Sequence, residues 1–177
     1  MGLFDIFKKN NNIINENGLN KIYFNGGKSE KLKSEFYKKN GKYHGEFITY
    51  YENLWMDKGN PELKLIFKNG VEHGEFISYY QSGGIQSKLN FVDGIEQGEA
   101  IYYYEDGIIK EKGKYINGKK HFLWTSYSEN GNKIRYAAYV QGEQHGKMAE
   151  YYSNGNLKVE SGFINKLAHG QSKTYYK

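Results

Sequence analysis

The sequence predicts an all-β protein, an elongated antiparallel meander of about six hairpin repeats. The first observation behind this prediction is a period of 24 residues, which is the spacing from Gly74 to Gly98 and from Gly146 to Gly170. The second is that each unit contains two alternating segments, each followed by a glycine turn. The third is composition, because 18 Tyr and 10 Phe supply much of the apolar surface and aromatic side chains suit sheets. We expect about twelve strands.

Within one unit, the first predicted strand is Glu75–Tyr80, and a glycine turn at Gly83 ends it. The second strand, Lys88–Val92, ends at Asp93-Gly94, a dipeptide that favours a two-residue hairpin turn. Successive strand side chains point to opposite faces, so the adjacent tyrosines of each unit are predicted to lie on opposite faces. The second tyrosines of these pairs form one column along the sheet, and Ser128 takes the place of the tyrosine in one unit. The members of this column are Tyr51, Tyr80, Tyr104, Tyr152 and Tyr176.

The chain divides into two predicted parts, residues 1–20 and residues 21–177. Met1–Lys9 has apolar residues at the spacing of one short helix, which we interpret as a cap on the first edge of the sheet. The alternative is an anchor to an anionic membrane surface that ends in two lysines; we favour the cap. Asn10–Asn20 is Asn-rich and is predicted to be a linker, and residues 21–177 form the repeat domain.

Charge and composition favour a solvated, mildly basic surface over a groove that binds nucleic acid. The net charge is +5, but Arg135 is the one arginine among 25 basic residues, and arginine is the side chain best suited to phosphates and guanine edges. We therefore expect no specific nucleic-acid binding. The chain has no Cys, no apolar run long enough to span a membrane and no cleavable signal pattern at its start, so we expect a cytoplasmic location.

The recurring pattern is Gly, four or five residues, Tyr-Tyr, two residues, Gly, an aromatic before Asn-Gly, and a closing His-Gly. This pattern, which covers about Lys21–Lys177, resembles the variant MORN repeat. Bacterial proteins made of such repeats resemble the YwqK-type antitoxin family, and the resemblance implies an antitoxin or immunity protein. Phe122 departs from the pattern at a closing glycine, Lys166 at a turn glycine and Ser128 at a second tyrosine.

Residues that could carry chemistry form one column. His44, His73, His121, His145 and His169 each precede a closing position, and Gln97 takes the same place in another unit. Equivalent residues of adjacent units should lie about 10 Å apart, too far for shared zinc bonds of about 2 Å. We predict a repeated turn role for the His-Gly pairs, with no metal, no cofactor and no catalytic residue, so the chain is not expected to be an enzyme.

The candidate contact residues are large side chains at departures from the repeat or on the aromatic face. Trp55 and Met56 lie in the segment Glu52–Glu62, which carries the extra residues of one unit. This segment is either a protruding contact loop or a loop that folds back onto the sheet. Trp124 is either a contact residue or a packing residue, and packing is favoured. The complete candidate set is Trp55, Met56, Tyr80, Tyr104, Trp124 and Tyr152.

The predicted function is that of a non-catalytic protein that binds a cognate toxin and neutralises it by steric occlusion. The alternative is a MORN-type scaffold or an adaptor that binds anionic lipids.

Overall fold

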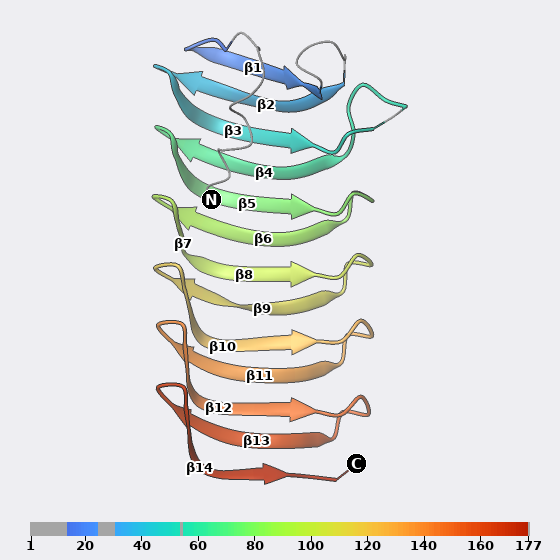
Figure 1. Ribbon diagram of the computed structural model, residues 1–177, viewed down its shortest axis with the longest axis vertical. Coiled ribbons are helices and arrows are strands. Elements are labelled where there is room, and N and C mark those ends of the chain that lie inside the picture. The colour runs from blue at the N-terminus through green and yellow to red at the C-terminus, as the bar shows by residue number, and fades with distance from the viewer. Residues whose placement is uncertain (1–13, 25–30, 54, 177) are drawn as a thin grey trace.

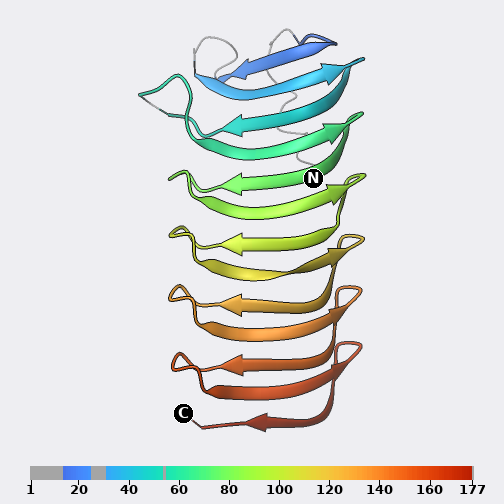
Figure 2. The same cartoon turned by 180° about the vertical axis from the view of Figure 1, so that it is seen from behind.

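The computed structural model describes residues 14–24, 31–53 and 55–176. These residues form one 14-stranded antiparallel sheet in which the strands follow each other in chain order. The one deviation is the short β7, which pairs with β6 beside β8. Figure 1 shows the strands stacked along the long axis, and Figure 2 shows the same ladder from behind. The predicted all-β meander of hairpin repeats is confirmed, with two strands more than the expected twelve.

The strand bounds show why the count is higher: the first strand begins before Lys21, and one long strand is divided into β7 and β8. The strands are β1 (Gly18–Tyr23), β2 (Leu32–Lys39), β3 (Lys42–Tyr50), β4 (Pro61–Lys68), β5 (Val71–Tyr79), β6 (Ile85–Val92), β7 (Ile95–Glu96), β8 (Gly98–Tyr103), β9 (Ile109–Ile116), β10 (Lys119–Tyr127), β11 (Lys133–Val140), β12 (Glu143–Tyr151), β13 (Leu157–Ile164) and β14 (Leu167–Thr174).

The two sides of the ladder carry different turns. On one side, two-residue turns such as Asn69-Gly70 have positive φ at both positions, 54° and 89°. This is the geometry of a tight hairpin turn that matches the twist of its strands. On the other side, the amide of Gly83 donates to the carbonyl of Tyr80 at 2.9 Å, and the amide of Tyr80 donates to the carbonyl of Gly84 at 2.8 Å. We call this second side the tyrosine side; its described residues are 51–53, 55–60, 80–84, 104–108, 128–132 and 152–156.

The closing glycines lie at bends inside strands, whereas the sequence suggested a turn role for the His-Gly pairs. Gly74 has φ +102° in the middle of β5, and the pairing between β4 and β5 shifts where Leu65 and Phe67 face this region. A residue with positive φ inserted in a strand is a bulge, and bulges bend strands. Phe122 has φ +59° at the equivalent place in β10, a backbone conformation that costs a side-chain-bearing residue free energy.

The core lies on one face of the sheet and is densest over the first strands. Phe36 and Phe47 stack with ring centroids 5.4 Å apart, and Tyr43 contacts Phe47 and Phe67 from the neighbouring row. The buried cluster consists of Ile22, Phe36, Phe47, Leu65 and Phe67. Because the residues described form one layer of strands with no second sheet above it, large rings from adjacent strands cover each other.

The start of the repeat array lies slightly before the predicted boundary at Lys21. β1 begins at Gly18, and Asn20, which was placed in the linker, is buried in that strand. The helix predicted for Met1–Lys9 lies outside the described residues. Among the residues that the structure does describe, no helix is long and apolar enough to cross a membrane.

Candidate functional site

The second tyrosine of a unit bonds to the next unit along the tyrosine side. The phenol of Tyr80 donates to the backbone carbonyl of Tyr103 at 2.7 Å, and the phenol of Tyr104 donates to the carbonyl of Tyr127 at 2.8 Å. Tyr152 makes the same bond to the carbonyl of Tyr175 at 2.8 Å. The hydroxyls of these candidate contact residues are therefore engaged in holding adjacent units together.

The series is interrupted at Ser128. Its turn has the same backbone bonds as the others, since the amide of Ser128 donates to the carbonyl of Asn132 at 2.8 Å. The Ser128 hydroxyl also turns back to that carbonyl, at 3.3 Å. No ring therefore crosses from this turn to the following unit.

A hollow of about 510 Å³ lies beside these tyrosines. It extends across β6, β8, β9, β10 and β11, and its walls combine phenol rings with short polar side chains. The lining residues are Tyr80, Gln86, Ser87, Tyr102, Tyr103, Tyr104, Lys110, Glu111, Ser126, Tyr127 and Ile134. The structure thus brings the candidates Tyr80 and Tyr104 together at one site.

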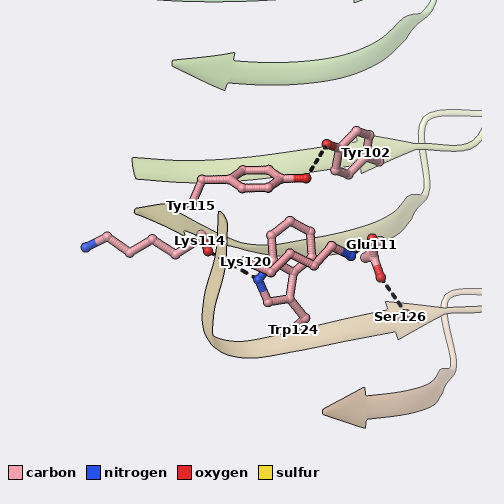
Figure 3. Close-up of polar contacts among 7 residues, drawn as sticks. All are labelled: Tyr102, Glu111, Lys114, Tyr115, Lys120, Trp124 and Ser126. Atoms are coloured by element: carbon pink, nitrogen blue, oxygen red, sulfur yellow. Dashed lines mark hydrogen bonds and ion pairs between the residues drawn. The ribbon is translucent and has the colours of Figure 1, made fainter. Parts of the chain in front are cut away.

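A polar network surrounds one end of the hollow (Figure 3). The carboxylate of Glu111 accepts hydrogen bonds from Lys120 Nζ at 3.0 Å and from the Ser126 hydroxyl at 3.3 Å. Lys120 also lies 3.8 Å from the centre of the Trp124 ring. Glu111 is therefore held as one member of a salt-bridged cluster over the indole.

Tyr102 is the most strongly perturbed titratable group in this network. Its hydroxyl lies 3.3 Å from the hydroxyl of Tyr115. Burial, followed by the hydrogen bond with Tyr115, raises the pKa of Tyr102 far above its ordinary value. The phenol therefore stays protonated and can donate or accept hydrogen bonds in the hollow.

Trp124 lies beneath the surface rather than on it. Its side chain is 2% exposed, and its indole nitrogen donates to the carbonyl of Lys114 at 3.2 Å. A ring so placed cannot contact a partner directly, so the packing interpretation is the correct one. The reason is that small neighbours, Gly113 and Ala137, leave room for the ring against the sheet.

Trp55 and Met56 occupy the longest connection of the tyrosine side, between β3 and β4. They are 91% and 54% exposed. Figure 1 shows this loop projecting beyond the other connections on that side. The amides of both residues donate to the side-chain oxygen of Asn53, at 2.9 Å and 3.2 Å.

The base of this loop is fixed to its neighbours. The amide of Leu32 donates to the carbonyl of Asp57 at 2.6 Å, and Lys58 forms an ion pair with Glu35 at 3.0 Å. On the other side, the Asn60 amide group donates to the carbonyl of Gln81 at 3.0 Å. The loop therefore presents two exposed apolar side chains on an anchored base, beside the turn that begins with Tyr80.

Three members of the column, His73, His121 and Gln97, bond to the two-residue turns. His121 Nδ1 accepts a hydrogen bond from the amide of Gln141 at 3.2 Å, and Gln97 accepts one from the amide of Asn117 at 2.9 Å. Each bond reaches the first turn residue of the following hairpin. Within the described residues, no group of three or more His, Cys, Asp or Glu side chains is placed to hold a metal ion.

Two features were missed by sequence analysis. Asn17 accepts from the amide of Asn40 at 2.7 Å and precedes Gly18, which has φ +98°, so this pair repeats the His-Gly role at the start of the array. The dipeptide Asn17-Gly18 was the available signal. The hollow had no sequence signal, because its lining depends on which side chains stand opposite each other in neighbouring strands.

Comparison with known families finds three matches to the MORN repeat variant, at residues 72–93, 96–117 and 144–165. These matches support a MORN-repeat protein, a class that the sheet of repeated hairpins also fits. A protein of this class is a repeat scaffold or a binding protein.

The other two comparisons add nothing to that class. No curated protein matches the chain. Among solved structures, a chain in "Crystal structure of GtfA/B complex bound to UDP and GlcNAc" is similar with 10% sequence identity and a TM-score of 0.26. The match covers 51% of this chain and 18% of that chain, and a likeness at this level carries no argument.

Proposed function

We propose that the chain binds a protein partner through its tyrosine side and has no catalytic role of its own. The observation that carries this proposal is the anchored loop with Trp55 91% exposed and Met56 beside it. Trp is among the side chains that contribute most to protein interfaces, and an ordered loop loses less entropy on binding than a loose one.

We further propose that the partner is a toxin, which the chain neutralises in the cytoplasm by covering its functional surface. This refinement is supported by the resemblance of the repeat pattern to bacterial antitoxins. A rigid surface of tyrosines supports occlusion, because Tyr offers a large amphipathic area with few torsions to immobilise.

The test is co-expression with the product of the neighbouring gene, followed by measurement of growth and of complex formation. We expect the neighbour to be toxic alone and harmless in the presence of this chain. The double substitution Trp55→Ala with Met56→Ala should weaken the complex by about 2 kcal/mol or more. Leu167→Ala is the matched control, since Leu167 is an exposed apolar residue on the opposite side of the ladder.

The alternatives have distinct outcomes. A neighbour that is harmless alone, or that stays toxic beside folded protein, contradicts the antitoxin function. Binding to vesicles that contain anionic lipid, with no protein partner recovered, would instead favour a membrane-surface adaptor.

A further inference from the structure

We propose that the gap at Ser128 is a binding site for a tyrosine side chain of the partner. This inference rests on the proposed function, because the tyrosine would belong to the protein bound on the tyrosine side. The proposed contact group of the partner is a phenol, which supplies both an aromatic ring and a hydroxyl that donates a hydrogen bond.

The template for this site is present four times in the molecule itself. Four of the second tyrosines lie along the tyrosine side, and each donates its hydroxyl to the carbonyl of the first tyrosine in the next unit. The four donors are Tyr51, Tyr80, Tyr104 and Tyr152, and their O···O distances are 2.8, 2.7, 2.8 and 2.8 Å. The sheet therefore accepts a phenol at regular positions.

At Ser128 the receiving structure is complete and the phenol is missing. The turn Ser128–Asn132 keeps the backbone bonds of its counterparts, including the 2.8 Å bond from the amide of Gly131 to the carbonyl of Ser128. By the spacing of the repeat, the accepting group here is the backbone carbonyl of Tyr151. No side chain of the described residues donates a hydrogen bond to this carbonyl. Ser128 is too short to do so, and its hydroxyl is bonded to Asn132.

The hollow extends to residues on both sides of the Ser128 turn in the sequence. The lining of the hollow ends at Tyr127, the residue before the Ser128 turn, and at Ile134, the second residue after it. Ile134 supplies an apolar contact for a ring, and Tyr104 supplies the neighbouring ring of the series. A phenylalanine would fill the space without reaching the carbonyl, whereas a tyrosine satisfies both requirements.

One partner can reach both this gap and the exposed loop. The connection from β3 to β4 and the connection from β10 to β11 lie on the same side of the ladder, six strand spacings apart. At about 4.8 Å for each spacing, this separation is roughly 29 Å. A protein interface of standard size, about 800 Å² on each partner, spans such a length.

The site can be tested without a partner by using p-cresol, which is the tyrosine side chain as a free molecule. We expect p-cresol to shift the amide resonances of Ser128, Ile134 and Tyr152 in a saturable way. Toluene, which has the same ring and no hydroxyl, should bind at least fivefold more weakly. Ser128→Tyr should occupy the gap and reduce p-cresol binding at least tenfold, whereas Ser128→Ala should leave it unchanged.

Two results would overturn the site: no saturable shift at these residues, or equal p-cresol binding by wild type and Ser128→Tyr. The far-ultraviolet circular dichroism and melting temperature of Ser128→Tyr confirm that a loss of binding is not a loss of folding. If that variant does not fold, Ser128→Phe, which fills the gap without a hydroxyl, replaces it with the same expected loss.

The partner is tested separately. Ser128→Tyr should weaken the complex at least tenfold, and Ser128→Ala should not. Unchanged partner binding by Ser128→Tyr overturns the assignment of the occupant. Because the p-cresol measurement needs no partner, it still decides the site when the co-expression experiment fails.

Discussion

The indole of Trp124 lies directly on Gly113 of the neighbouring strand. A Cβ atom added at Gly113 would lie 2.2 Å from the ring, although real atoms never approach so closely. Gly113 also lies in the interior of β9, where a glycine destabilises the strand and is typical of a place that another group approaches closely. The ring and the missing side chain therefore form one packing unit.

Gly113→Ala should lower the free energy of unfolding by about 3 kcal/mol, because the indole must move from a tightly packed place. Trp124→Ala should lower it by about 4 kcal/mol through loss of the buried ring. In the Trp124→Ala background, Gly113→Ala should cost almost nothing, since the obstacle is gone. Urea denaturation of the four proteins gives this cycle, and additive losses would show that the two residues act independently.

Tyr104→Phe tests the bond between units. The variant keeps the ring and removes the hydroxyl that donates to Tyr127, so the free energy of unfolding should fall by about 1 kcal/mol. Tyr103→Phe is the matched control, expected to change stability by less than about 0.5 kcal/mol. Equal effects of the two substitutions would show that the hydrogen bond from Tyr104 to Tyr127 does not stabilise the fold.

The repeat architecture could be predicted because its signals are local. Gly70 and Gly83 adopt positive φ, which glycine tolerates better than other residues. The spacing between such turns sets the lengths of the strands. The closing glycines were harder to interpret, because a positive φ at Gly74 produces a turn or a bulge according to whether the strands continue to pair on both sides.

The binding surface could be predicted only in part. The extra residues of one unit predicted a loop at Trp55 but left open whether it protrudes or folds back onto the sheet. The anchoring of this loop through Asp57 and Asn60 depends on neighbouring strands. Trp124 was open to two interpretations, because a Trp at a strand position packs or protrudes according to the size of its cross-strand neighbours. Glycine and alanine opposite Trp124 decided this in favour of packing.

Phe122→Gly should stabilise the protein. Phe122 has φ +59° where equivalent units have glycine, and its ring is 56% exposed. Relief of the backbone strain should raise the free energy of unfolding by about 1 kcal/mol. Phe122→Ala keeps the strained conformation and should give no increase. A gain for alanine as large as that for glycine would place the effect in the ring and not in the backbone.

Glu35→Gln should reduce the sensitivity of folding to acid. Burial alone would raise the pKa of Glu35, but hydrogen bonds from Tyr50 and Lys58, with the charge of Lys58, lower it below the ordinary value of 4.5. A lowered pKa in the folded state adds stability above the unfolded value, and this stability is lost as pH falls through the folded pKa.

The measurement is urea denaturation at several pH values from about 7 to about 3. The wild type should lose more of its free energy of unfolding over this range than Glu35→Gln, because the variant has no carboxyl to protonate. Glu46→Gln, at an exposed carboxyl in the next strand, is the control and should follow the wild type. Identical pH profiles for wild type and Glu35→Gln would show that the Glu35, Tyr50 and Lys58 contacts do not hold the carboxylate in its charged form.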